Sequence, residues 1–335
     1  MPEQGKHVLV TGGAGYIGSH TAKALAAAGF IPVTYDNLTF GHRWAVQWGP
    51  MVEGDVRDRA KLIDTLRRYE IAAVLHFAAL AYVGESMRKP ELYYNNNVTG
   101  GLTLLESMLE TGVRHIVFSS SCATYGTPQV VPIAEDTPQL PVNPYGETKL
   151  AIERALRWLG AAHPLSWAAL RYFNAAGADA AGDVGELHAP ESHLIPLVLE
   201  AVLSGQPVEV YGGDYATRDG TCVRDYIHVT DLAEAHVRAL DYLLRGGASI
   251  ALNLGTGEGS TVHEVIETAR VVTGQKVPFR VASRRPGDPA ALVADAGRAG
   301  KILGWRPGHS SLKNIVKTAW DWRCAHLQKY LPESL

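Results

Sequence analysis

Cysteine is scarce in this chain of 335 residues, and the way it is distributed excludes two kinds of site. Cys122, Cys222 and Cys324 lie far apart and form no C-x-x-C pair, so neither a disulfide framework nor a thiolate zinc site is expected. The 13 histidines form neither H-x-x-x-H nor H-E-x-x-H, which are spacings typical of metal sites on helices. The sequence therefore predicts no bound metal.

Long apolar runs and clustered charges are also lacking. There is no uncharged apolar run of about 18 residues, and the opening stretch MPEQGKHVLV has no apolar core of a signal peptide. The formal net charge is −3, and lysines and arginines are scattered, which gives no electrostatic reason to bind nucleic acid or an anionic membrane. We expect a cytoplasmic protein with no nucleic acid and no membrane as partner.

What the sequence does contain is a 46% share of hydrophobic residues, ample for a packed core, and an alternation of apolar strands with helical segments. Nearly all-apolar strands separated by helices indicate a parallel sheet covered on both faces, a doubly wound α/β fold of the Rossmann type. Ligands of such sheets lie beyond the carboxyl ends of the strands. The expected strands are 7–11, 31–36, 72–79, 115–121 and 167–174, and helices are expected at about 91–111 and from residue 143.

A glycine-rich turn follows the first expected strand. HVLVT leads into GGAGYIGS and then into the helix-favouring HTAKALAAAG, and Gly12, Gly15 and Gly18 have the spacing of a dinucleotide-binding turn. Glycine is needed there because a Cβ would keep the backbone away from a pyrophosphate, and the helix N-terminus offers free N–H groups and a positive dipole end. The turn is therefore a candidate phosphate site.

Asp36 supports this interpretation because it ends the next expected strand, IPVTYDN. Its position is close to the spacing of roughly 20 residues at which a carboxylate accepts hydrogen bonds from the ribose hydroxyls of a dinucleotide. Because its charge would repel a 2′-phosphate, NAD is favoured over NADP.

A serine, a tyrosine and a lysine form the candidate catalytic group. Ser121 ends the strand HIVFSSS, while Tyr145 and Lys149 stand four residues apart at the start of a helix that Asn143 and Pro144 can open. A free tyrosine is a poor base at neutral pH, but nearby cations stabilise its phenolate. Lys149 and a positive nicotinamide ring would be two such cations, so the group can take a proton from an alcohol while hydride leaves for NAD.

With TGGAGYIGS, SSSCATYG and YGETK in place, the chain resembles the extended short-chain dehydrogenase/reductase superfamily and, within it, the UDP-glucose (UDP-galactose) 4-epimerases. YDNL, EGDVRD, HFAALAYVGES, YYNNNVTG, LRYFNAAG, DYATRDGTCVRDYIHVTDLAEAH, NLGTGEG and RRPGDPA are also similar to that family's stretches, in the same order. The resemblance implies a tightly bound NAD, a transient 4-keto sugar and no net redox change. We expect an NAD-binding Rossmann domain at 1–177, with returning segments around 225–260, and a smaller α/β UDP-sugar-binding domain at 178–335.

The resemblance also implies roles for individual residues. The catalytic residues would be Ser121, Tyr145 and Lys149. NAD would be held by Gly12, Gly15, Tyr16, Ile17, Gly18, Asp36, Asn37, Asp55, Val56, Phe77, Ala78, Ala79, Asn97, Ser119, Tyr145, Lys149 and Phe173. The UDP-sugar would contact Ser121, Tyr145, Asn174, His193, Leu194, Tyr211, Arg224, Tyr226, Arg285, Asp288 and Leu292, with Tyr211 as a platform for uracil.

Three positions depart from the usual pattern of the family. His193 stands where an asparagine is often found beside the substrate, and Ala81 stands where many relatives carry a lysine. Leu292 lies at the position where a tyrosine excludes an N-acetyl group and a small residue admits it. Leucine is intermediate in size, so UDP-N-acetylglucosamine remains an alternative substrate.

Other functions also remain open. AYVGES, CATYG and DGTCVRDY are similar to UDP-arabinose/UDP-xylose 4-epimerases, which use the same chemistry on a smaller sugar. A 4,6-dehydratase would need an Asp-Glu pair that SSSCAT lacks, and a protein that only binds NAD(H) would not need an intact Ser, Tyr and Lys. The apolar faces of GGLTLLESMLE and LAIERALRWLG predict a homodimer.

Overall fold

A seven-stranded parallel sheet forms the centre of the computed structural model, which describes residues 5–285 and 287–330. The strand order is β11-β6-β5-β4-β1-β2-β3, and every neighbouring pair is parallel. This confirms the predicted α/β fold of the Rossmann type. The strands are β1 (His7–Thr11), β2 (Ile31–Asp36), β3 (Met51–Glu53), β4 (Ala73–His76), β5 (His115–Ser121), β6 (Ser166–Tyr172) and β11 (Ile250–Leu254).

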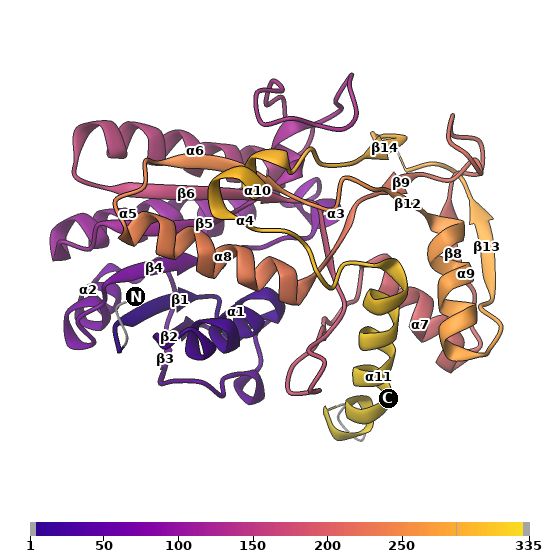
Figure 1. The fold of residues 1–335 in the computed structure, drawn as a ribbon, viewed down its shortest axis with the longest axis horizontal. Coiled ribbons are helices and arrows are strands. Elements are labelled where there is room, and N and C mark those ends of the chain that lie inside the picture. Colours follow the sequence, from indigo (N-terminus) through magenta and orange to yellow (C-terminus); the bar gives the residue numbers. More distant parts are fainter. Residues whose placement is uncertain (1–4, 286, 331–335) are drawn as a thin grey trace.

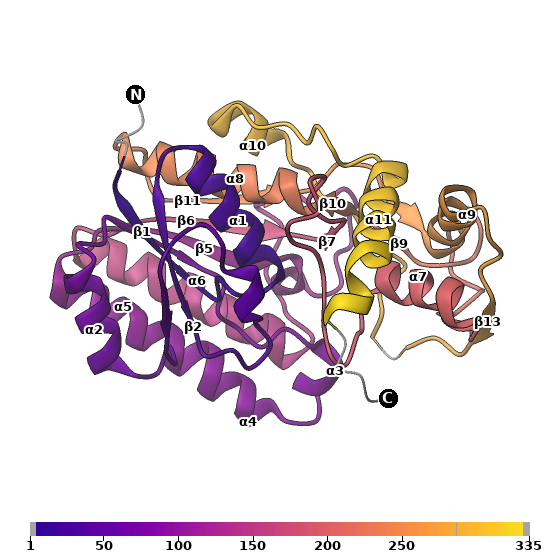
Figure 2. The same cartoon turned by 90° about the horizontal axis from the view of Figure 1, so that it is seen from below.

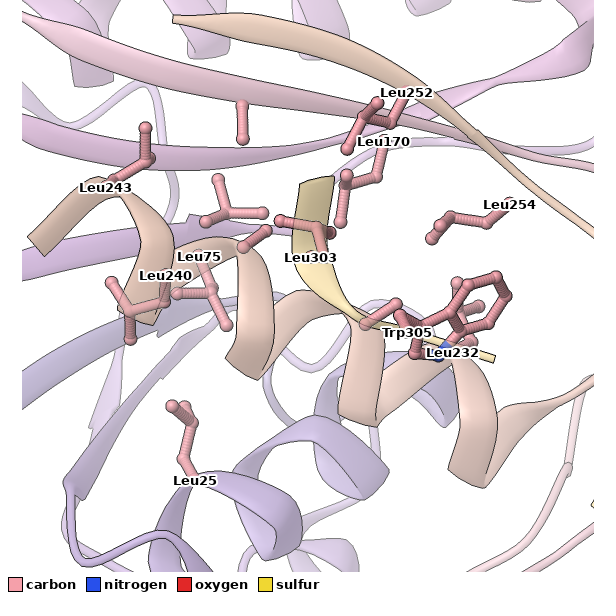
Figure 3. Close-up of a cluster of buried hydrophobic side chains, with 14 of the residues drawn as sticks. Leu25, Leu75, Leu170, Leu232, Leu240, Leu243, Leu252, Leu254, Leu303 and Trp305 are labelled. Carbon is pink, nitrogen blue, oxygen red and sulfur yellow. The ribbon is translucent and has the colours of Figure 1, made fainter. Parts of the chain in front are cut away.

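Helices cover both faces of this sheet, as the nearly all-apolar strands require. Figure 2 shows α1, α8 and α10 on one side and α2, α5 and α6 on the other. Leucines of the first group and of the strands converge with Trp305 in one apolar layer (Figure 3), and a second buried cluster fills the opposite face. The bounds are α1 (Tyr16–Ala27), α2 (Arg59–Arg68), α5 (Gly100–Thr111), α6 (Pro144–Ala162), α8 (Val229–Leu244) and α10 (Gly297–Leu303).

The helical stretch expected at about 91–111 contains a π-helical turn that the sequence pattern did not indicate. It begins as α4 (Pro90–Tyr93), passes through the π turn η2 (Tyr94–Thr99) and continues as α5. Inside the turn, Asn97 is buried and its side chain bonds both backbone groups of Leu80 and the hydroxyl of Thr148. The turn therefore fixes the segment after β4 against the start of α6.

Most elements after residue 190 gather at one end of the molecule, on the right of Figure 1, around a separate apolar core, among them α7, α9, β8, β9, β12, β13 and β14. β8 and β13 pair in parallel, β10 pairs with β7, and β9 lies between β12 and β14. Short 3-10 turns η1 (Arg43–Ala45) and η3 (Cys122–Tyr125) and the helix α3 (Val83–Ser86) lie in loops of the larger part. The remaining bounds are β7 (Asn174–Ala176), α7 (Leu194–Ser204), β8 (Val208–Tyr211), β9 (Val223–Arg224), β10 (Tyr226–His228), β12 (Ser260–Thr261), α9 (Val262–Thr273), β13 (Phe279–Ala282), β14 (Ala291–Leu292) and α11 (Leu312–Tyr330).

Besides α10, two late elements pack on or complete the central sheet and lie outside this smaller part. α8 packs along α1, and β11 pairs with β6 as the last strand of the sheet, although both follow β7 to β10 in the chain. Across residues 5–285 and 287–330, no helix combines the length and apolar character needed to cross a membrane.

Candidate active site

The glycine turn lies between β1 and α1. The space available for a Cβ differs among its three glycines. Gly12 has a positive φ of 72°, and a Cβ there would lie 2.6 Å from the backbone nitrogen of Ala78. A Cβ on Gly18 would lie 2.2 Å from the carbonyl oxygen of Gly12. On Gly15 it would meet the same oxygen at 3.3 Å and no other atom of the described residues within 4 Å, chain neighbours and the helix's own backbone aside. Gly12 and Gly18 are therefore needed for close backbone packing within the protein. Gly15 instead adjoins open space beside the turn.

That space adjoins the N-terminus of α1. Gly15 is the N-cap of this helix, and no side chain caps its free N–H groups. Because such groups and the helix dipole attract phosphate, the turn fits the pyrophosphate of a dinucleotide. Tyr16 and Ile17 form the first turn of the helix, and the Tyr16 hydroxyl donates to the carbonyl oxygen of Gly177 at 2.6 Å.

Asp36 stands at the carboxyl end of β2, beside the glycine turn. Its carboxylate accepts hydrogen bonds from the backbone nitrogens of Ala14 at 3.0 Å and Leu38 at 2.8 Å. Burial raises its pKa, and these two hydrogen bonds oppose that effect. The side chain is thus held at the position where an adenosine ribose lies in this type of fold.

The rest of the candidate cofactor set follows the neighbouring strand ends. Asn37 donates to Asp55 at 3.3 Å, and the pKa of Asp55 is lowered to about 2, chiefly by a hydrogen bond with Arg57. Ala78 and Asn97 line a narrow crevice. Val56, Phe77, Ala79, Ser119 and Phe173 stand directly after, or at the end of, strands or in the loops that follow them.

Ser121, Tyr145 and Lys149 converge where β5 meets the start of α6. Asn143 caps α6 by accepting from the backbone nitrogen of Gly146 at 2.8 Å, as the sequence indicates. The Lys149 ammonium donates to the backbone carbonyl oxygen of Ser119 at 2.8 Å and lies 5.8 Å from the centre of the Tyr145 ring.

The ionisation of this group in the protein alone is set by burial. Burial raises the pKa of Tyr145 well above its ordinary value, and a hydrogen bond with Ser121 opposes this rise. Burial also lowers the pKa of Lys149 to about 7. The expected lowering of the tyrosine pKa is therefore not a property of the protein alone, because desolvation dominates in so enclosed a position.

The candidate substrate residues lie where the smaller part meets the sheet edge. Leu292 pairs with Arg224 across β14 and β9, and packs against the buried cluster that contains Cys122 and Phe173. Leu292 thereby stands near the carboxyl end of β5, which Cys122 follows. The Asn174 side chain donates to the carbonyl oxygen of Asp225 at 3.0 Å.

Within this set of residues, two pairs of side chains are in contact, which the sequence did not indicate. Arg224 forms an ion pair with Asp288. A diphosphate bound by Arg224 would therefore share its guanidinium with the Asp288 carboxylate. The Arg285 guanidinium lies 3.9 Å from the centre of the Tyr211 ring and thus covers one face of the expected uracil platform. Tyr226 is buried, His193 is the N-cap of α7, and Leu194 is its first residue.

The chain matches a protein-family model over most of its length. The model of the NAD dependent epimerase/dehydratase family matches residues 8–255, which include the glycine turn and the Ser-Tyr-Lys group. The chain belongs to this family.

Individual members of the family are similar over nearly the whole chain. A UDP-glucose 4-epimerase of Rhizobium leguminosarum bv. trifolii is 54% identical over 319 residues, which cover 95% of this chain and 97% of the relative. The crystal structure of UDP-glucose 4-epimerase from Brucella ovis in complex with NAD is 51% identical, with a TM-score of 0.93 and coverage of 94% and 98%. That from Bifidobacterium longum in complex with NAD⁺ and UDP is 39% identical, with a TM-score of 0.92 and coverage of 97% and 100%.

Sequence reasoning missed a buried network behind the family's Ser-Tyr-Lys group. Glu153 accepts from the Ser120 hydroxyl at 2.5 Å and from both Nε and Nη2 of Arg171, at 2.9 and 2.6 Å. A signal was present in the sequence, because Glu153 continues the four-residue series of Tyr145 and Lys149 on one face of α6.

Proposed function

We propose that the protein is a UDP-glucose 4-epimerase that interconverts UDP-galactose and UDP-glucose through a transient 4-keto sugar. The observation that carries this proposal is the meeting of Ser121, Tyr145 and Lys149 beside a dinucleotide turn, in a chain 54% identical to a UDP-glucose 4-epimerase. An isomerase also explains why the cofactor would stay bound, since each cycle returns it to its starting state.

NAD fits the residues around the glycine turn, and the chemistry it supplies when bound is reversible two-electron oxidation at C4 of the sugar. Gly15 and the N-terminus of α1 would hold its pyrophosphate, Asp36 its adenosine ribose, and Lys149 the nicotinamide end. The family's dependence on NAD supports this assignment.

Tyr145 is proposed to take the proton of the sugar C4 hydroxyl and to return it after the ring has turned over in the pocket. Burial opposes ionisation of its phenol, so positive charge must lie nearby when the proton moves. Lys149 supplies part of that charge, and its pKa of about 7 leaves both of its forms available near neutral pH. Ser121 lies close enough to Tyr145 to oppose the rise in its pKa and would share the same proton.

The smaller part is proposed to hold the UDP-sugar. Arg224 and Asp288 would keep the diphosphate and ribose in place, and Tyr211 with Arg285 would face the base as one stacked unit. We accordingly divide the chain into an NAD-binding part at 1–177, joined by segments around 225–260, and a UDP-sugar-binding part at 178–335.

We propose that the size of Leu292 selects among UDP-hexoses, N-acetylated UDP-hexoses and UDP-pentoses. The Leu292 side chain packs against the buried cluster that contains Cys122, the residue that follows β5, and Phe173, so its bulk would limit the room for a substituent on the sugar. A leucine favours the unsubstituted hexose over UDP-N-acetylglucosamine, and it would leave a pentose less tightly enclosed.

We propose a cytoplasmic homodimer as the working form. Two neighbouring helices carry exposed apolar side chains, Leu102 on α5 and Trp158 on α6, the latter 78% exposed. Large exposed apolar groups on adjacent helices are typical of a contact between subunits.

The experiment is a substrate panel without added cofactor. The purified protein is incubated separately with UDP-galactose, UDP-N-acetylgalactosamine and UDP-xylose, and the anomeric protons are followed by NMR. Fastest conversion of UDP-galactose to UDP-glucose supports the proposal. Faster conversion of UDP-N-acetylgalactosamine or UDP-xylose would make that sugar the proposed substrate instead. If no sugar is converted while acid still releases NAD from the protein, the epimerase function is contradicted.

A further inference from the structure

Four side chains with metal-ligating atoms gather in the loop that precedes α7. They come from the short stretch GELHAPESH and are Glu186, His188, Glu191 and His193. One ligand atom from each lies within 4.8 Å of all the others. The prediction of no bound metal considered histidine spacings that suit helices, and this cluster lies on irregular backbone.

The distances between these atoms are close to the edges of a tetrahedron. For metal–ligand bonds of about 2.0–2.1 Å, neighbouring ligand atoms of a tetrahedral site lie about 3.3–3.4 Å apart. His188 Nδ1 lies 3.2 Å from Glu186 and 3.7 Å from Glu191, and His193 Nδ1 lies 3.6 Å from Glu191. His193 and Glu186 are closer, at 2.5 Å, and the two Glu191 distances are to different oxygens of its carboxylate. Side-chain rotations of Glu191 and His193 would therefore bring one oxygen and the two imidazole nitrogens into place around an ion.

One buried polar atom of the cluster lacks a hydrogen-bond partner among the described residues. His188 Nδ1 is buried and makes no hydrogen bond of acceptable geometry, although two carboxylates flank it. Glu186 is itself buried and its Oε1 lies 2.5 Å from His193 Nδ1, so this carboxylate depends on positive charge within the cluster. An ion at the centre would satisfy both groups at once.

We propose that Glu186, His188, Glu191 and His193 bind one divalent first-row transition-metal ion in a closed tetrahedral site. Two imidazole nitrogens and two carboxylate oxygens are suited to Zn²⁺. Because the four side chains fill all the positions of a tetrahedron, no position is left for substrate, and the role of the ion is structural.

The location of the cluster indicates what the ion would hold in place. The His188 ring packs edge-on against Tyr16 of α1 and against Tyr82, with ring centres 6.3 Å apart in both pairs. His193 is the N-cap of α7. The ion would therefore fix the start of α7 beside the first turn of the dinucleotide helix, while Nε2 of the half-exposed His193 remains on the far side of its ring.

The test uses the full chain without a histidine tag, treated with a chelator and titrated with CoCl₂. We expect one Co²⁺ per chain, with the intense visible bands of tetrahedral cobalt, and displacement by one equivalent of Zn²⁺. His188→Gln and Glu191→Gln should each weaken binding by at least about tenfold, because each removes one of four ligands. His163→Gln, which changes an exposed histidine outside the cluster, should bind like the wild type.

Three results would overturn the site. These are the absence of a saturable band at one equivalent, a weak spectrum typical of octahedral cobalt, and an unchanged titration in a folded His188→Gln protein. Circular dichroism establishes folding, and Glu191→Gln decides the matter if His188→Gln does not fold. None of these measurements depends on turnover, so the outcome is independent of the proposed activity.

Discussion

Glu153 of α6 and Arg171 of β6 form an ion pair in which each side chain is only 1% exposed, with Arg171 Nη2 lying 2.6 Å from Glu153 Oε2. The same carboxylate accepts from Ser120, whose two neighbours in β5 face Lys149 and Tyr145. Glu153 therefore joins the helix that carries the candidate base to the strand that carries the candidate serine, and Arg171 joins both to β6. Arg171 extends the network to Tyr125, which bonds Asn253 of β11.

Breaking this pair is expected to be costly. Arg171→Met leaves a buried carboxylate without its cation and should lower the free energy of unfolding by about 3–5 kcal/mol, measured by urea denaturation. In the double variant with Glu153→Gln the loss should be smaller than the sum of the two single losses. Additive losses would mean that the two side chains contribute independently.

Tyr145→Phe tests the proposed base. Phenylalanine fills the same buried space but cannot exchange a proton, so kcat should fall by about 10²–10⁴-fold with little change in unfolding temperature. Conversion of UDP-galactose is measured by NMR. Tyr94→Phe, which alters a tyrosine that is 44% exposed, is the matched control, and an equal loss in both variants would remove Tyr145 from the proposed role.

Alanine at two glycines separates cofactor binding from folding. A Cβ on Gly18 collides with the Gly12 carbonyl, so Gly18→Ala should destabilise the fold by about 1–3 kcal/mol. A Cβ on Gly15 would meet the Gly12 carbonyl oxygen at 3.3 Å, a tight contact that a shift of a few tenths of an ångström relieves. Gly15→Ala should therefore be destabilised less than Gly18→Ala, yet retain less NAD. Unfolding temperature and NAD released by acid are measured on both variants, and a Gly15→Ala protein with full NAD content would contradict the pyrophosphate assignment.

Lys149 predicts a pH dependence of stability. Its pKa falls from 10.5 to about 7 on burial, so between these values the unfolded chain binds more protons than the folded one. Its contribution to stability therefore rises with pH from about 7 to 10 and is constant below that window. The difference in unfolding free energy between the wild type and Lys149→Met should follow this rise, and a flat difference would mean that the lysine is not desolvated.

The proposed dimer is tested at α6. Trp158→Asp places a charge on the expected contact and should convert a dimer into a monomer in sedimentation velocity experiments. Val271→Asp on α9, at a residue that is 57% exposed, is the control and should leave the mass unchanged. A wild type that sediments as a monomer would end the proposal.

The fold could be predicted because it rests on local signals. Apolar strands, the glycine turn and the cap at Asn143 each depend on residues close together in sequence. The pKa of Tyr145 could not be predicted, because it depends on how completely other elements bury the ring. The contact of Arg285 with Tyr211 arises from tertiary approach, for which no spacing in the sequence is a guide. The cluster around Glu186 is local in the sequence, but its side chains converge through an irregular backbone that the helical histidine spacings do not describe.

β11 has a consequence for how the chain is made. The edge of the central sheet at β6 is completed by residues 250–254, and α8, which covers one face, ends at Leu244. During synthesis, residues 1–177 therefore emerge before α8 and β11 exist. Part of one apolar face of their sheet and the edge of β6 stay exposed to solvent until most of the smaller part has also been synthesised. The two halves are expected to mature together, and a gene truncated after residue 177 should yield an aggregating product.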